Sequence, residues 1–250
     1  MTLLRNLLIA ALVITGASGC AVNPVTGKQQ LMFSSPEQDI ATGAQHYQPS
    51  QQSQGGQYVV DPQLTTYINQ VGKKLAAVSD NPNLPYEFVV LNNDVPNAWA
   101  LPGGKMAINR GLLVELKDES QLAAVLGHEI VHAAARHSAS QQSKGMLVNA
   151  GVMLAGVAAL SQDSEYGALA VGAMGVGANA WMSKYSRDHE LEADHYGIDY
   201  MIKAGYDPMG AVELQETFVK LSEGNQSSWL DGLFASHPPS RERVIANRRM

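Results

Sequence analysis

The chain has 250 residues, 45% of them hydrophobic and 16% charged, which is ordinary for a globular domain that can bury a core without disulfides. Its formal net charge of −6 at pH 7 gives no electrostatic support for nucleic-acid binding. These values exclude a basic nucleic-acid-binding module and a small fold that depends on disulfides.

The amino terminus has the pattern of an export signal that precedes the folded domain. Arg5 supplies a positive charge, residues 7–14 form an apolar run too short to span a membrane, and small residues at 16–19 lead to Cys20. Cys20 is the only cysteine, so it cannot form an internal disulfide. The residues before it resemble a bacterial lipobox, and we expect a lipid on Cys20 after cleavage. An ordinary signal peptide with a chance cysteine is the alternative.

These features divide the chain into three expected segments. They are a signal peptide at 1–19, a lipidated tether at 20–34 and a folded domain at 35–250. The expected location is the periplasm, with contact to the membrane through the lipid alone. Ala21, which follows the lipidated position, favours the outer membrane of a Gram-negative cell.

Helix and strand signals follow in chain order. Ser35-Pro36 and Asp61-Pro62 are each typical of a helix start, with a capping residue before a proline in the first turn. Residues 86–91 are rich in β-branched and aromatic side chains, which predicts a strand. Residues 98–109 have the pattern of a hairpin or a bent edge strand around the turn residues 102–104.

The second half of the chain is predicted to be mainly helical. A short helix near 111–116 precedes a longer one that begins at Asp118 and runs to about His137. Two apolar blocks within 146–182 are each too short to span a bilayer, so we expect a helical hairpin over the core or a mobile lid, with membrane contact as the alternative. Further helices are expected at 187–204, from Asp207-Pro208 onward, and up to Met250.

His128-Glu129-Ile130-Val131-His132 forms an H-E-x-x-H motif inside the longer predicted helix. A spacing of four places both imidazoles on one helix face, one turn apart, which suits two ligands of a tetrahedral zinc ion. Glu129 lies close enough to reach a metal-bound water without binding the metal. Zinc lowers the pKa of that water, and a carboxylate can accept its proton as the water attacks a peptide carbonyl. The motif therefore predicts a metallopeptidase with one zinc ion per chain.

A third metal ligand has to come from another segment. A metzincin would need glycine and histidine at the positions of Ala135 and Ser138, so that pattern fails. Glu190 and Asp194 lie four residues apart and share a helix face. One of them can bind the metal while the other orients a ligand imidazole through its N–H group.

The remaining polar residues near these motifs are expected to face elsewhere. His137 lies five residues beyond His132, about 140° around a continuous helix, and is interpreted as a surface or capping residue. Glu192 is expected to be solvated. His189 and His195 flank the acidic pair on other faces, and we do not expect either to be a ligand.

The combination of motifs resembles the gluzincin peptidases, a group that includes CAAX prenyl proteases, HtpX-like proteases and soluble BepA-like periplasmic lipoproteins. The matching segments are 23–27, 97–104, the H-E-x-x-H helix, Ser186-Arg187 and His237-Pro238. The resemblance implies an α+β, helix-dominated zincin (gluzincin) fold with a small β-sheet beside the H-E-x-x-H helix. It also implies that Glu190 is the third ligand and that Asp194 supports a ligand imidazole.

The same resemblance suggests roles for two residues near the carboxyl terminus. His237 is expected either to occupy the place of the catalytic water, as a self-inhibiting switch, or to stabilise the transition state. A loop histidine beside two prolines is the alternative. Arg243 matches a family arginine that could contact the substrate carbonyl or the carboxylates of the site, whereas Arg187 is expected to be structural.

Asn97, Ala98, Trp99 and Ala100 resemble the family's edge strand, on which an extended substrate adds as a further strand. Backbone hydrogen bonds at a sheet edge are available to any sequence, so extended or unfolded polypeptides are the expected partners. An interior hairpin that packs Trp99 is the alternative.

The expected function is a zinc-dependent endopeptidase acting on misfolded or unassembled envelope proteins. The alternative is a zinc-containing chaperone or assembly factor for outer-membrane proteins, with a site closed by His237 and the outer-membrane assembly machinery as a partner. A purely structural zinc is a weaker reading, because such sites rarely have a free carboxylate like that of Glu129 beside the metal.

Overall fold

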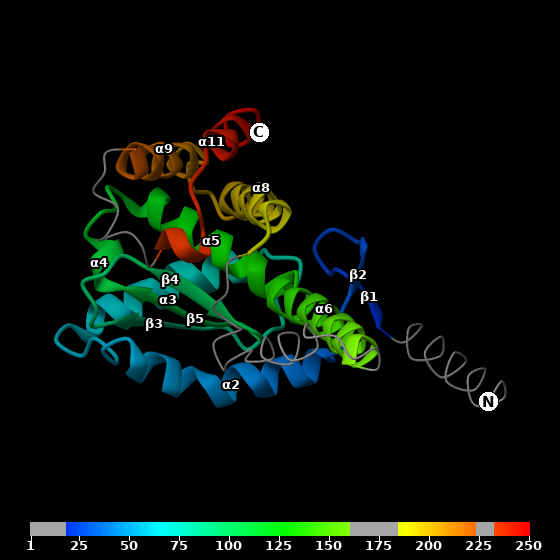
Figure 1. Ribbon diagram of the computed structural model, residues 1–250. Helices are drawn as coiled ribbons and strands as arrows, with labels where there is room; N and C mark the ends of the chain where they lie inside the picture. Colours follow the sequence, from blue (N-terminus) through cyan, green and yellow to red (C-terminus); the bar gives the residue numbers. More distant parts are fainter. Residues whose placement is uncertain (1–18, 161–184, 224–232) are drawn as a thin grey trace.

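The computed structural model describes residues 19–160, 185–223 and 233–250 (Figure 1). It begins with a hairpin in which β1 (Cys20–Val22) pairs antiparallel with β2 (Gln29–Leu31). Helix α2 (Pro36–Ser53) follows, and its start is a capping box in which Ser35 and Gln38 satisfy each other's backbone N–H groups. Helix α3 (Pro62–Ala76) has a simpler cap at Asp61, whose side chain accepts from the backbone N–H of Gln63.

A three-stranded sheet forms the middle layer of the domain. Its strands are β3 (Glu87–Leu91), β4 (Ala98–Leu101) and β5 (Lys105–Asn109), in the order β3-β5-β4. Strand β5 pairs parallel with β3 and antiparallel with β4, which confirms the hairpin predicted at 98–109. Gly103 and Gly104 form the connecting turn with positive φ angles, a conformation that glycine adopts readily. Strand β4 is at the edge of this sheet within the described residues.

The two faces of the sheet pack against different helices, because side chains alternate along each strand. One face carries Val90, Ala98 and Ile108 into the main core, together with apolar residues of α3 and the central helix α5 (Glu119–Ala134). The opposite face packs Trp99 of β4 edge to face against Tyr47 of α2, with ring centroids 6.2 Å apart. Strand β4 is thus an edge strand in the sheet, and it also packs Trp99 into a core.

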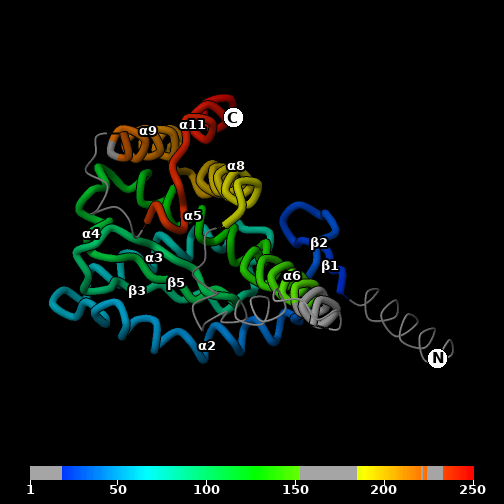
Figure 2. Tube along the Cα trace, in the orientation of Figure 1, coloured from blue at the N-terminus to red at the C-terminus, as the bar shows by residue number. Residues whose placement is uncertain are grey.

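Helix α5 lies at the centre of the domain, and most of its residues are buried. Its amino terminus is capped by Asp118, and the short α4 (Arg110–Leu113) precedes it. Figure 2 shows α2 on one side of the sheet and α5 on the other, with three further helices beyond α5. These are α8 (Arg187–Lys203), α9 (Met209–Glu223) and α11 (Arg241–Asn247). The helix-dominated α+β fold with small sheets is therefore confirmed.

Three differences from the expected elements concern the segments around α5. Helix α5 ends at Ala134, and Arg136 has a φ of 57°, so that α6 (His137–Leu160) begins as a separate helix. The segment 20–34, expected to be a tether, instead pairs as the β1–β2 hairpin and buries Asn23, Val25 and Met32. Only the first part of 146–182 lies in α6, and residues 161–184 lie outside the described residues. Within the described ranges, no helix is long and apolar enough to cross a membrane.

Helices α5 and α8 approach each other closely where two glycines meet. A Cβ atom built on Gly127 would lie 3.1 Å from the carbonyl oxygen of Gly197, and one built on Gly197 would lie 3.0 Å from the backbone nitrogen of His128. Because neither residue has a side chain, the two backbones can touch. This contact brings the face of α8 that carries Glu190 and Asp194 toward the histidines of α5.

Replacing Gly197 with valine tests this crossing. The new side chain would have to occupy space that the backbone of α5 already fills. We expect Gly197→Val to destabilise the fold by about 1–3 kcal/mol, because overpacking forces backbone shifts. Chemical or thermal unfolding measures the change.

Gly145→Ala in α6 is the matched control, since nothing lies within 4 Å of a Cβ atom added there. Alanine favours a helix over glycine, so this variant is expected to be as stable as the wild type or more stable by up to about 1 kcal/mol. A Gly197→Val protein with unchanged stability would contradict the close crossing.

Candidate active site

The two histidines of the H-E-x-x-H motif meet a carboxylate from α8. His128 and His132 point their Nε2 atoms toward each other, 3.0 Å apart, from successive turns of α5. Glu190 lies in the first turn of α8, with Oε1 at 3.3 Å from His132 Nε2 and Oε2 at 3.5 Å from His128 Nε2. Sequence analysis expected these three residues to converge, and the structure brings them together.

His237 completes the group from the carboxyl-terminal part of the chain. Its Nδ1 atom lies 3.0 Å from Glu190 Oε1 and 3.2 Å from His128 Nε2. One ligand-type atom from each of His128, His132, Glu190 and His237 lies within 4.8 Å of the others, and all four side chains are largely buried. Neighbouring ligands of a tetrahedral zinc are expected about 3.3 Å apart, from bond lengths near 2.0 Å. The imidazole and carboxylate donors therefore fit a zinc-type metal site in both chemistry and spacing.

Glu129 lies beside this group without being part of it. Its nearest described partner is His237, whose Nε2 atom lies 3.4 Å from Glu129 Oε1. The other carboxylate oxygen, Oε2, is buried and has no hydrogen-bond partner among the described residues. A buried carboxylate oxygen without a donor is costly, so this atom is suited to accept a proton or a hydrogen bond from a bound water or substrate.

Asp194 and Arg243 support the metal-binding side chains from behind. Asp194 Oδ1 lies 2.9 Å from His128 Nδ1, which fixes that ring with Nε2 facing the other ligands. Arg243 forms a two-pronged pair with Asp194 through Nε and Nη2, both at 2.6 Å, and its Nη1 lies 2.8 Å from Glu190 Oε2. Of the two contacts expected for Arg243, the structure shows the one with the carboxylates of the site.

The charges of the site are tuned by burial and by these neighbours. Burial alone would raise the pKa of Asp194, but the adjacent Arg243 guanidinium keeps it below its ordinary value. Burial also opposes ionisation of Glu190, yet the histidines around it hold its pKa well below the usual range. For His128 burial acts to lower the pKa, and the two carboxylates outweigh it and raise the pKa to about 10. The site is thus a negative environment that favours a cation.

His137 occupies a different position from the one expected. Its side chain is fully buried, with Nδ1 at 2.8 Å from His132 Nδ1 and Nε2 at 3.0 Å from Glu192 Oε1. The 140° estimate assumed that α5 continues to His137, but the left-handed Arg136 breaks the helix and turns His137 back toward His132. Arg136 is held there by Asp39, through a contact of 2.7 Å, and by the carbonyl oxygen of Ser34.

Glu192 also differs from expectation, whereas His189 and His195 do not. Glu192 is half-buried and binds His137, so it is not a solvated side chain. His189 is no part of the metal group but stacks on His137, with ring centroids 4.2 Å apart. His195 is exposed, as a residue on another helix face should be.

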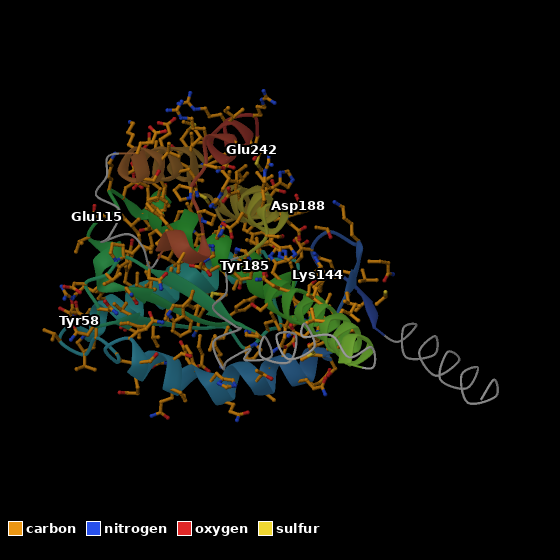
Figure 3. The ribbon with its side chains drawn as sticks, in the orientation of Figure 1. Tyr58, Glu115, Lys144, Tyr185, Asp188 and Glu242 are labelled. Carbon is orange, nitrogen blue, oxygen red and sulfur yellow. The ribbon has the colours of Figure 1, made fainter. Side chains whose placement is uncertain are left out.

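Tyr185 is a further residue near the site that sequence reasoning missed. Its ring stacks on His132 with centroids 3.8 Å apart, and its hydroxyl lies 2.9 Å from the hydroxyl of Ser138. Burial raises the pKa of Tyr185, which keeps the phenol neutral. Figure 3 shows Tyr185 near the middle of the molecule, whereas Glu242, the partner of Arg187, lies at the surface. No local pattern marks a single tyrosine before a helix as a neighbour of a metal site.

The segment 97–100 lies directly beside the site. Ala98 lines a cavity of about 40 Å³ together with His128, Glu129, Val125 and Leu233. The carbonyl oxygen of Asn97 accepts from the backbone N–H of Asn109, which holds the start of β4 to β5. All four residues of β4 are buried.

Comparison with known proteins places this site in a family. The sequence pattern of peptidase family M48 matches residues 62–250, which include the H-E-x-x-H helix, Glu190 and His237. The chain belongs to peptidase family M48. The resemblance to the gluzincin peptidases is thereby confirmed, and the buried group around His128 is a metal-binding site typical of M48 peptidases.

Several known proteases are similar to most of the chain. It is 38% identical over 181 residues to the mitochondrial metalloendopeptidase OMA1 of Schizosaccharomyces pombe, covering 72% of this chain and 51% of that protein. It is 31% identical over 192 residues to the beta-barrel assembly-enhancing protease of Escherichia coli K12, covering 75% and 39%. For the metalloprotease YcaL of the same strain, the identity is 33% over 191 residues, covering 73% and 70%. The chain thus spans about half or less of the first two relatives.

Removing Arg243 tests how the M48 site tolerates its buried carboxylates. We expect Arg243→Met to destabilise the metal-free protein by about 3–5 kcal/mol, because Asp194 and Glu190 lose the cation that compensates their buried charges. Unfolding in a chelator measures the loss.

Arg241→Met is the matched control in the same helix, since Arg241 forms an exposed ion pair with Glu223. Exposed pairs contribute little, so this variant should unfold like the wild type. Equal stability of the two variants would mean that Arg243 does not compensate the buried carboxylates.

Proposed function

We propose that this chain is a zinc-dependent endopeptidase that hydrolyses misfolded or unassembled proteins of the cell envelope. The observation that carries the proposal is the convergence of His128, His132 and Glu190 in one buried group, with Glu129 beside it, whose Oε2 has no hydrogen-bond partner among the described residues. We assign the first three residues as zinc ligands and Asp194 as the group that orients His128. Membership of peptidase family M48 supports this assignment.

Glu129 acts as general base and then as general acid in this proposal. A zinc ion, when bound, polarises both a water molecule and the carbonyl of the peptide to be cleaved. The free oxygen of Glu129 accepts the proton of the attacking water and delivers it to the leaving amine. Arg243 keeps Asp194 and Glu190 in place through its guanidinium contacts. His237 either vacates the ligand group when substrate arrives or stabilises the developing charge.

The substrate is an extended polypeptide that adds to the edge strand β4. Asn97, Ala98, Trp99 and Ala100 supply the backbone of this edge, and Ala98 lines the same cavity as Glu129. Strand addition selects for extended backbone rather than for particular side chains, which suits unfolded or unassembled proteins. Similarity to a protease named for beta-barrel assembly supports an envelope substrate.

Attachment to the membrane through a lipid on Cys20 belongs to the same proposal. Cys20 is exposed and is the first residue of β1, so its thiol is accessible at the start of the described fold. The signal-like residues 1–19 support export to the periplasm, with the outer membrane as the expected site of attachment. Mass spectrometry of the processed protein would test both cleavage and lipidation.

A second candidate is a metal-containing chaperone or assembly factor for outer-membrane proteins. Two observations favour a closed resting state: His237 lies within the metal-binding group, and all residues of β4 are buried. A site held shut in this manner would bind partners, including the outer-membrane assembly machinery, without cleaving them. Loss of function in a Glu129 variant distinguishes the enzyme from the chaperone.

Glu129→Gln is the direct test of the enzyme. The amide cannot accept the proton of the attacking water, so we expect casein cleavage to fall by at least about 100-fold, the lower range for a general base. Zinc content and unfolding temperature should stay at wild-type values, because Glu129 is not assigned as a ligand.

Glu213→Gln, an exposed change on α9, is the control for loss of one negative charge. It should cleave casein at the wild-type rate. Undiminished cleavage by zinc-loaded Glu129→Gln would refute the assigned base, and retention of the cellular phenotype by this variant would favour the chaperone.

A further inference from the structure

The amino-terminal β1–β2 hairpin is connected to the metal-binding group through side chains. Asn23 lies in the turn region of the hairpin and is 2% exposed. Its Nδ2 atom donates to Glu192 Oε1 over 2.8 Å, and the same carboxylate oxygen lies 3.0 Å from His137 Nε2. His137 in turn contacts His132. A continuous path therefore runs from the hairpin to a metal ligand.

We propose that Asn23, Glu192 and His137 form a relay of positioning residues that fixes His132 for metal binding, so that the amino-terminal hairpin is a working part of the metal site. This inference rests on the proposed zinc site. It assigns a role to Asn23, which the motif at 23–27 marked in the sequence without explaining it.

The metal at one end of the relay and the Glu192 carboxylate at the other determine which atom donates in each hydrogen bond. A metal bound by His132 Nε2 requires the proton of that ring on Nδ1, which then donates to His137 Nδ1. His137 must therefore carry its proton on Nε2, where it donates to the Glu192 carboxylate. Glu192 is acceptor-only when ionised, and it accepts from both His137 and Asn23. The donor and acceptor assignments along the relay are therefore mutually consistent.

The orientation of the Asn23 amide is also determined by its surroundings. Its Oδ1 atom accepts from the backbone N–H groups of Val25 at 2.9 Å and Thr26 at 3.2 Å. Its Nδ2 must therefore face Glu192, and an exchanged amide would lose these bonds. Asn23 closes the turn with one end of its side chain and holds Glu192 with the other.

The hairpin also contacts the break between α5 and α6, from which His137 emerges. Gln30 donates from Nε2 to the carbonyl oxygen of Ala135 over 2.8 Å, just past the end of α5. His189 covers the outer face of His137 by stacking on it. Figure 1 shows the hairpin beside α6 and near the start of α8, where these contacts occur. His132 is thus supported through His137 and Glu192, much as His128 is supported by Asp194 and Arg243.

Asn23→Asp tests the contact with Glu192 while leaving the hydrogen bonds of the turn in place. The new side chain keeps an oxygen for the N–H groups of Val25 and Thr26, but it presents a second carboxylate oxygen to Glu192 in place of a donor. Loss of such an outer partner typically weakens metal binding about 10–100-fold, and we expect a change at the lower end of that range. The measurement is the Zn²⁺ dissociation constant of the full chain, by competition with a chromogenic chelator.

Combining Asn23→Asp with Glu192→Gln reverses the donor and the acceptor at this contact. Because one oxygen of Glu192 accepts from both Asn23 and His137, the new amide has to shift so that its nitrogen donates to the new carboxylate while its oxygen still accepts from His137. We expect Glu192→Gln alone to weaken zinc binding, and the double variant to recover to within about threefold of the wild type, which is a coupling that independent sites do not show. The visible spectrum of the Co²⁺-loaded protein should change in the single variants and return in the double variant.

Thr26→Ala is the control within the same turn, since its hydroxyl accepts from the backbone N–H of Lys28 and contacts no member of the relay. It should bind zinc as the wild type does. Folded single variants with wild-type zinc affinity, or a double variant whose losses simply add, would overturn the relay. Failure of the wild type itself to bind zinc would instead overturn the proposed zinc site.

Discussion

The contact between the backbones of α5 and α8 at Gly127 and Gly197 is the constraint on which the site depends. Each helix supplies only part of a metal site, and neither part can bind an ion alone. The two glycines let the helices approach until the Glu190 carboxylate reaches both imidazoles of α5. The sheet and α2 form the other side of the domain and hold α5 from behind. The missing side chains of two glycines thus allow residues from two helices to converge on one metal-binding group.

The site also shows how buried charges can be kept together. Asp194 and Glu190 are both held ionised, and a single buried guanidinium from Arg243 contacts both of them. The pKa of His128, raised to about 10 by these carboxylates, reflects the negative environment that remains. A metal ion bound by His128 has to displace the proton that this environment attracts, so metal binding and proton release are coupled. The carboxylates therefore serve cation binding more than stability.

Much of the fold was predictable because its signals are local. Ser35, Asp61 and Asp118 each cap a helix as their sequence context indicates, and the glycines after Pro102 make the predicted turn. Convergence of His128, His132 and Glu190 followed from helical spacing and family resemblance, and their assignment as zinc ligands stays a prediction.

The errors in the sequence analysis have a common cause, which is contact between distant segments. Arg136 adopts a left-handed conformation while its side chain binds Asp39 in α2, and no residue next to Arg136 in the sequence indicates this conformation. The expected helix therefore ran past Ala134, and His137 was assigned to the wrong face. Glu192 was predicted to be solvated because its partner Asn23 lies 169 positions away in the chain. The hairpin at Cys20–Leu31 pairs locally, but distant contacts hold it to the domain, from Asn23 to Glu192 and from Gln30 to Ala135.

The position of Cys20 at the first residue of β1 limits how far the protein could extend from a membrane if Cys20 carried a lipid. Only two residues separate Cys20 from Asn23, a span of at most about 10 Å even when extended, and Asn23 is already fastened to the domain. A lipid on Cys20 would therefore leave no slack between bilayer and protein. The folded domain would stay at the membrane surface, and it would act only on chains that emerge close to the membrane plane.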